Sequence, residues 1–201
     1  MNSVESFIRF CESEFGTAVM NREAAYVKQH VAAADRILDV GCGIGSLEER
    51  FPDHEIIGLD RSGEMVQAAR NRVSAPFIIG DATQLPLATE SVNTVVSVST
   101  LEFIPDLETV LAEATRVLAS EGTLVALVLN TRSEYVQSNL QREGSYFQRM
   151  IHRDSKEVTE RILEYVDGEQ EFFLGISDDE VFESADPTTA AISAVVGTPH
   201  K

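Results

Sequence analysis

The stretch ILDVGCGIGSLEERF, Ile37 to Phe51, decides the fold of this chain. It begins as a short apolar run, passes through glycines at alternate positions (Gly41, Gly43 and Gly45) and ends in a helix-like pattern. A buried strand, a tight turn and a helix are predicted in that order. Because glycine has no Cβ atom, such a turn can bring the backbone close to a ligand. The stretch therefore predicts a ligand-binding loop after the first strand of a sheet.

Apolar runs alternate with helical patterns beyond this loop. The runs are Ile37–Val40, Ile56–Leu59, Phe77–Ile79, Val92–Val98 and Thr123–Leu129. The helical patterns are Ser46–Phe51, Glu64–Arg72 and Leu107–Leu118, the last with Gly122 as its predicted stop. Strands that are continuously apolar and alternate with helices are typical of a parallel sheet covered on both faces. The predicted fold class is α/β, a Rossmann-like doubly wound sheet.

Both ends of the chain add to this core. The spacing predicts two helices between Ser3 and Ala33, with a break at Gly16, and an antiparallel strand pair at Glu171–Ile176 and Ala190–Val196. The predicted sheet is seven-stranded and mostly parallel. We expect a single domain over 1–201, with N-terminal helices or a lid in 1–34, a core in 35–130, and substrate-side helices and the last strands in 131–201.

The composition narrows the classes of partner. The chain of 201 residues carries a net charge of −17 and has a pI near 4.5. A surface of that sign repels nucleic acid and anionic lipid headgroups, and no apolar run is long enough to span a bilayer. Cys11 and Cys42 show neither a disulfide framework nor metal-ligand spacing. With no signal peptide evident at the first residues, we expect a cytoplasmic protein without nucleic-acid or membrane partners.

Polar residues follow each of the first four predicted strands. They are Asp39 with Gly41, Cys42, Gly43, Ile44 and Gly45; Asp60; Gly80, Asp81 and Ala82; and Ser99, Thr100, Leu101 and Glu102. Ligands of open α/β sheets bind at the carboxyl ends of the strands, so these residues outline the predicted site.

The ligand can be narrowed from these residues. Ser46 stands where a dinucleotide fingerprint requires a third glycine, which disfavours a pyrophosphate. Asp60 follows Gly41 by about 20 residues, where a carboxylate accepts hydrogen bonds from ribose hydroxyls. The carboxylates of Asp39, Asp60 and Asp81 would suit a ligand with one cationic end, such as S-adenosylmethionine. The alternatives are that Asp39 fixes the loop and that Asp60 caps the next helix.

Four strings in sequence carry a family resemblance: LDVGCGIG, GLDRSGEMVQAAR, IIGDATQLPLATESVNTVVSVSTLEFIPD and RVLASEGTLVALVLN. They resemble the successive motifs of class I S-adenosylmethionine-dependent methyltransferases of the ubiquinone-biosynthesis-like, type 11 branch, over about residues 35–130. The resemblance implies methyl transfer from S-adenosylmethionine, with S-adenosylhomocysteine as product and no metal. It assigns cofactor contacts to Asp39, Gly41, Cys42, Gly43, Gly45, Asp60, Arg61, Met65, Asp81, Ala82, Ser99, Thr100 and Leu101.

No catalytic residue emerges with comparable clarity. Many relatives have Glu-His where this chain has Glu102 and Phe103, which puts a histidine-based proton transfer here in doubt. Glu102 and His152 are weak candidates for a general base. Cys42 lies in the loop with no histidine near it in sequence, so it is interpreted as a small packing residue and not as a nucleophile.

The acceptor is predicted to be a small molecule. Residues 130–161 hold Arg132, Arg142, Arg149, Arg153, Lys156 and Arg161 beside several aromatic residues, a pattern typical of a solvated helix or an anion-binding lid. Small anionic metabolites are therefore the first acceptors to consider. The N-terminal helices carry aromatic residues that either pack in the core as an apolar stripe or form the other wall of the site: Phe7, Phe10, Phe15 and Tyr26. Two other functions stay open: a catalytically inactive cofactor-binding subunit and, less favoured because of Ser46, a nicotinamide oxidoreductase.

Overall fold

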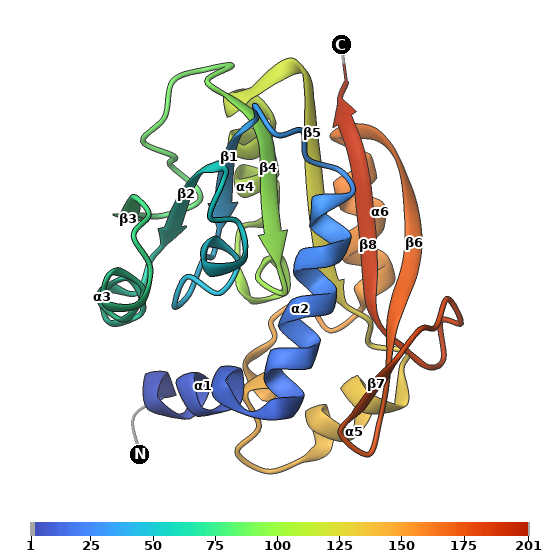
Figure 1. The fold of residues 1–201 in the computed structure, drawn as a ribbon. Coiled ribbons are helices and arrows are strands. Elements are labelled where there is room, and N and C mark those ends of the chain that lie inside the picture. Colours follow the sequence, from blue (N-terminus) through green and yellow to red (C-terminus); the bar gives the residue numbers. More distant parts are fainter. Residues whose placement is uncertain (1–2, 201) are drawn as a thin grey trace.

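The computed structural model describes residues 3–200, which fold into one eight-stranded sheet flanked by helices (Figure 1). The strands are β1 Arg36–Val40, β2 Glu55–Asp60, β3 Phe77–Ile79, β4 Val92–Val98, β5 Leu118–Leu129, β6 Val166–Ser177, β7 Glu180–Phe182 and β8 Ala190–Pro199. Their order in the sheet is β3-β2-β1-β4-β5-β8-β6-β7. The predicted doubly wound α/β class is confirmed.

The first five strands are parallel, as their continuous apolar runs predict. From β1 the chain moves outward through β2 to β3, and then returns to place β4 on the other side of β1. Strand order therefore reverses between β1 and β4, which is where open α/β sheets bind their ligands.

The C-terminal strands run antiparallel, and the prediction for β6 and β8 is confirmed. The predicted total of seven strands is one too few, because β7 pairs with β6. Asp178 and Asp179, the two residues between Ser177 and Glu180, both have positive φ, as in the tightest hairpin turns. Unlike β3, which is apolar at all three positions, β7 begins with Glu180 and lies in an acidic segment, so no apolar run marks it in the sequence.

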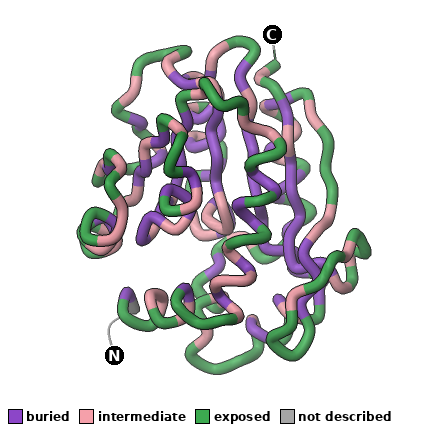
Figure 2. The backbone as a smooth tube through the Cα atoms, in the orientation of Figure 1, coloured by how far each residue is buried: buried purple, intermediate pink, exposed green. Residues whose placement is uncertain are grey.

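Helices cover both faces of the sheet. They are α1 Ser3–Glu12, α2 Glu14–Lys28, α3 Gly63–Arg72, α4 Leu107–Val117, α5 Glu134–Gln141 and α6 Ser155–Leu163, with short 3₁₀ turns η1 Glu48–Arg50, η2 Leu101–Phe103 and η3 Tyr146–Arg149. Apolar residues of α4 and α6 pack on one face and those of α2 on the other. Successive strand residues, such as Val95 and Val96, supply the two faces in turn. The central strands β1, β4, β5 and β8 are consequently the most buried part of the chain, whereas much of β6 is exposed (Figure 2).

Three local predictions are wrong. The N-terminal helices break at Ser13, the N-cap of α2, and not at Gly16. Gly16 instead lets the helices meet, since a Cβ there would lie 1.9 Å from the Phe10 carbonyl oxygen. Residues 46–51 form only the short η1 turn, and Gly122 lies within β5 rather than ending α4. A Cβ at Gly122 would lie 2.7 Å from the Asn93 carbonyl oxygen, next to a register shift between β4 and β5.

Helix α1 lies across the carboxyl ends of the parallel strands, at the bottom of Figure 1, and α5 lies at the same end of the molecule. Within residues 3–200, no helix is long and apolar enough to cross a bilayer. The N-terminal helices and the segment after β5 therefore close over the end of the sheet where the predicted site lies.

Candidate functional site

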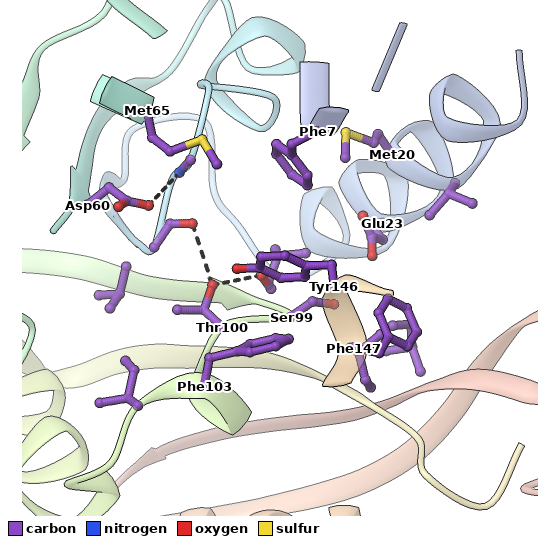
Figure 3. Close-up of a pocket in the computed structure, with 18 of the residues that line it drawn as sticks. Phe7, Met20, Glu23, Asp60, Met65, Ser99, Thr100, Phe103, Tyr146 and Phe147 are labelled. Carbon is purple, nitrogen blue, oxygen red and sulfur yellow. Dashed lines mark hydrogen bonds between the residues drawn. The ribbon is translucent and has the colours of Figure 1, made fainter. Parts of the chain in front are cut away.

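A cavity of about 280 Å³ opens at the carboxyl ends of β1 to β4. It is far larger than a bound water requires. Figure 3 shows Phe7, Met20 and Glu23 of the N-terminal helices facing Phe103, Tyr146 and Phe147 across it. Asp60, Met65, Ser99 and Thr100 line its other end. The cavity thus joins a polar end at the strand termini to an apolar end under the helices.

The glycine loop forms the floor of the polar end. Gly41 has φ +85°, and a Cβ there would lie 2.3 Å from the Thr100 side chain. The loops after β1 and β4 can therefore contact each other because Gly41 has no side chain. Gly43 has φ +54° and lines the cavity. Gly45 also has positive φ, but it faces Phe77 and Ala69 instead of the cavity.

Asp60 connects two loops at the end of β2. One carboxylate oxygen accepts a hydrogen bond from the Gly43 N–H at 3.0 Å, and the other accepts from the Ser62 N–H at 2.8 Å. The N-cap of α3 is Ser62, whose hydroxyl accepts from the Met65 N–H. Asp60 is therefore held at the cavity wall by the glycine loop and does not itself cap α3.

Asp39 lies beneath the loop and does not line the cavity. It is 3% exposed, and its Oδ1 atom has no hydrogen-bond partner among residues 3–200. Burial and the nearby Glu48 and Asp60 carboxylates raise the pKa of Asp39. Burial also raises the pKa of Glu48 to about 7, and both of its carboxylate oxygens lack partners within the same residues. A cation in the space above these two carboxyls would stabilise their ionised forms.

Cys42 lies in the same buried region. It is 6% exposed and does not line the cavity, and burial together with the charges of Asp39 and Glu48 raises its thiol pKa. A thiol held in its neutral form is a poor nucleophile. Cys42 packs beside Val66 and Ala69 of α3, so its contribution is to fill space behind the loop.

The ends of β2 and β3 supply the next part of the wall. Arg61, Met65, Asp81 and Ala82 all line the cavity. The exposed Asp81 carboxylate accepts hydrogen bonds from the N–H and hydroxyl of Thr83, which lower its pKa. Asp81 is therefore an ionised acceptor at the mouth of the cavity, while Ala82 is buried and packs in the core.

The residues after β4 are split between the cavity and the core. Ser99 and Thr100 line the cavity, whereas Leu101 and Glu102 do not. Ser99 has φ +47°, an unusual conformation for a residue with a side chain, and its buried hydroxyl has no partner among residues 3–200. The Glu102 side chain is fully buried behind the site, where it accepts from the Leu129 N–H at 2.9 Å. Burial raises the pKa of Glu102 to about 7.

His152 lies outside the cavity. Its ring donates from Nε2 to the Ile104 carbonyl oxygen at 2.9 Å, and it lines a separate, smaller hollow with Glu108 and Glu157. No group of His, Cys, Asp and Glu side chains within residues 3–200 is arranged to hold a metal ion.

The comparisons with known proteins agree with this arrangement. Residues 38–126 match the family described as a methyltransferase domain. This match confirms, over residues 38–126, the resemblance to the class I, type 11 S-adenosylmethionine-dependent methyltransferases. The matched residues run from β1 into β5 and so include the glycine loop, Asp60, Asp81 and Ser99.

Two curated relatives and one solved structure illustrate the range of similar proteins. The chain is 38% identical over 97 residues to malonyl-(acyl-carrier protein) O-methyltransferase from Xylella fastidiosa, which covers 44% of this chain and 33% of that protein. It is 33% identical over 103 residues to arsenite methyltransferase from Halobacterium salinarum, with 46% and 26% coverage. A Thermotoga maritima structure, described as a S-adenosylmethionine-dependent methyltransferase and possible histamine N-methyltransferase, superposes with a TM-score of 0.82 at 22% identity, over 98% of this chain and 95% of that one.

The chain therefore spans less than half the length of either curated relative. At 22% identity, the Thermotoga structure shows the fold alone. The methyltransferase domain of residues 38–126 excludes the N-terminal helices and everything after the middle of β5.

Most of the apolar end of the cavity comes from those excluded segments, with Phe103 added from the matched residues, and part of it was not predicted from the sequence. Glu23, Met20, Tyr146 and Phe147 line the cavity. One signal was present for Glu23: it follows Val19 by four residues and precedes Val27 by four, so it falls within the buried stripe of α2. In contrast, none of the six basic residues of 130–161 lines the cavity.

Proposed function

We propose that this chain is an S-adenosylmethionine-dependent methyltransferase that acts on a small-molecule acceptor. The observation that carries the proposal is the cavity that joins the strand-end carboxylates to an apolar wall, most of which comes from outside the matched domain. A cofactor and an acceptor have to meet in one enclosed space, and this cavity offers two chemically different ends for them.

The residues present fit the cofactor. Glycines at positive φ have no side chain and leave room for a ligand against the backbone. The buried Asp39 Oδ1 atom, which has no hydrogen-bond partner among residues 3–200, lies below that space. We propose that Asp39 balances the amino group and sulfonium by its field, while Asp60 takes the ribose hydroxyls. Asp81 and the Ala82 N–H would recognise the adenine, flanked by Arg61 and Met65. Gly41, Gly43, Ser99 and Thr100 would lie along the methionine arm.

The bound cofactor supplies an electrophilic methyl group on a good leaving group. The protein then has to position the acceptor and exclude water, and proximity of that kind can contribute several kcal/mol. Phe7 from α1 and Tyr146 from η3 approach each other across the cavity, with ring centroids 6.4 Å apart. These rings shield the reacting space from solvent.

The test begins with ligand binding. Calorimetric titration is expected to show binding of S-adenosylhomocysteine and none of NADH. The Asp60→Asn variant is expected to weaken S-adenosylhomocysteine binding by roughly 10- to 100-fold, because hydrogen bonds to a charged group contribute about 1.5–3 kcal/mol. Asp53→Asn, in an exposed loop, is the matched control and should bind as the unchanged protein does.

The outcomes separate the three candidate functions. Binding of S-adenosylhomocysteine followed by methyl transfer in a screen of acceptors with labelled cofactor supports the enzyme. Cofactor binding with no acceptor in a broad screen favours the inactive subunit. Tight NADH binding without S-adenosylhomocysteine binding overturns the proposal in favour of an oxidoreductase.

A further inference from the structure

A carboxylate without a partner lies in the acceptor end of the cavity. Glu23 of α2 is 8% exposed and lines the cavity. Among residues 3–200 no side chain or backbone group forms a hydrogen bond or ion pair with its carboxylate. In Figure 3 it lies with Phe7 and Met20 on the side opposite Phe103, Tyr146 and Phe147. A buried carboxylate is unfavourable unless it is paired, so this one has room for a partner that the chain itself does not supply.

The charged groups near Glu23 do not satisfy it. Arg50 of η1 attracts it but is bonded elsewhere, to the Asn21 side chain at 2.8 Å, the Ser46 carbonyl at 2.8 Å and Glu49 at 3.5 Å. Glu102 of η2 repels it. Tyr135 of α5 and the Cys11 thiol also lie within its field, and both are neutral at physiological pH, since burial raises pKa values that already lie above it.

The rest of this wall is aromatic. Rings contributed by four parts of the chain line the cavity: Phe7, Phe10, Phe103, Tyr135, Tyr146 and Phe147. The negative faces of aromatic rings attract cations, and more strongly where water is excluded. The one arginine of the lining, Arg61, lies at the cofactor end near Asp81. The acceptor end therefore has the chemistry of a site for an organic cation.

We propose that the methyl acceptor is an amine, and that Glu23 binds its ammonium and takes up one of its protons. The transfer is balanced: a proton passes from the nitrogen to a carboxylate oxygen, which leaves a neutral amine with a free lone pair and a neutral carboxylic acid. An ammonium has no lone pair, so this step is what makes its nitrogen a nucleophile.

The environment of Glu23 suits that role. Burial raises its pKa to about 8, against the opposing effect of Arg50, so its carboxylate is a stronger base than an exposed one. A positive ligand offsets the cost of burying the ionised carboxylate, whereas an anionic acceptor would find no basic residue in the lining at this end of the cavity. The inference rests on the proposed function, and it reverses the charge expected of the acceptor from the arginines of 130–161.

The experiment uses ligands that differ in charge and little in shape. Protein saturated with S-adenosylhomocysteine is titrated by calorimetry with phenethylamine, phenylethanol and phenylpropionate, and with the aliphatic set butylamine, butanol and pentanoate. In at least one set the amine is expected to bind at least tenfold more tightly than its neutral and anionic counterparts. In Glu23→Gln that preference should fall to within about threefold, and in Glu14→Gln, an exposed position of the same helix, it should persist.

The cofactor readout separates the two proposals. Glutamine is isosteric with the protonated carboxyl, so Glu23→Gln should keep its circular dichroism spectrum and its affinity for S-adenosylhomocysteine. If the unchanged protein fails to bind S-adenosylhomocysteine, the proposed function fails. If it binds S-adenosylhomocysteine but no amine exceeds its counterparts, or if Glu23→Gln keeps the preference, only the amine proposal is overturned.

Discussion

Replacing Glu102 by glutamine should stabilise the folded protein at alkaline pH. The Glu102 side chain is fully buried, its Oε1 accepts from the Leu129 N–H at 2.9 Å, and its Oε2 has no partner among residues 3–200. Burial raises its pKa from 4.5 to about 7. Glutamine keeps the shape and the acceptor for Leu129, and it cannot ionise.

The sign and size follow from proton linkage. A carboxyl whose pKa is raised on folding stabilises the protein below its unfolded pKa, and that contribution is lost as pH rises through the folded pKa. Each pKa unit corresponds to about 1.4 kcal/mol, so ionising Glu102 costs about 3 kcal/mol by pH 8. Near pH 5.5 the loss is only about 1 kcal/mol. The advantage of Glu102→Gln should therefore be roughly 2 kcal/mol larger at pH 8 than at pH 5.5.

Urea unfolding followed by circular dichroism measures this difference. The lower pH is set at 5.5 because the pI is near 4.5, and a protein close to zero net charge tends to precipitate. Glu143→Gln, in an exposed loop, is the matched control and should change the free energy of unfolding by less than about 0.5 kcal/mol at either pH. An equal effect of Glu102→Gln at both pH values would refute the assignment of a raised pKa to the buried carboxyl.

Three further changes probe the remaining contacts. Gly41→Ala should destabilise the fold by about 1–3 kcal/mol and abolish S-adenosylhomocysteine binding, because its Cβ would overlap Thr100. Adding Thr100→Gly to the same chain should restore part of the stability, measured by a thermal melt, and part of the binding, measured by calorimetry. Gly175→Ala should destabilise by about 1–3 kcal/mol through overlap with the Phe182 ring, and an unchanged melting temperature would show that β7 moves freely. Tyr26→Phe removes the hydrogen bond to Glu171 while keeping the stack on Phe173, so urea unfolding should report a loss of about 0.5–2 kcal/mol.

Predictions from sequence were most accurate where a short segment carries its own signal. Runs such as Phe77–Ile79 and Val92–Val98 match β3 and β4 to the residue, because buried parallel strands are rich in apolar and β-branched residues. Asp60 and Ser99 were identified because each follows such a run and therefore lies at the carboxyl edge of the sheet.

Errors arose where distant contacts decide the local structure. Gly122 reads as a helix stop, yet it lies in β5 because the backbone of β4 approaches it closely. The pattern after Gly45 reads as a helix, but the chain forms only a 3₁₀ turn there, with the Glu48 carboxylate buried below the loop. Neither result is encoded within a few residues, because both depend on what packs against the segment.

The sequence alone determined the five parallel strands of the core, the glycine loop and the carboxylates at the strand ends, since these depend on residues near one another in the chain. Only the tertiary structure decided which side chains line the apolar end of the cavity. Glu23 and Tyr146 are distant in sequence and line one cavity, while the basic residues of 130–161 do not line it. Burial and pairing of a charge depend on every element that surrounds it, so the unpaired carboxylate could be recognised only once the folded chain had enclosed it.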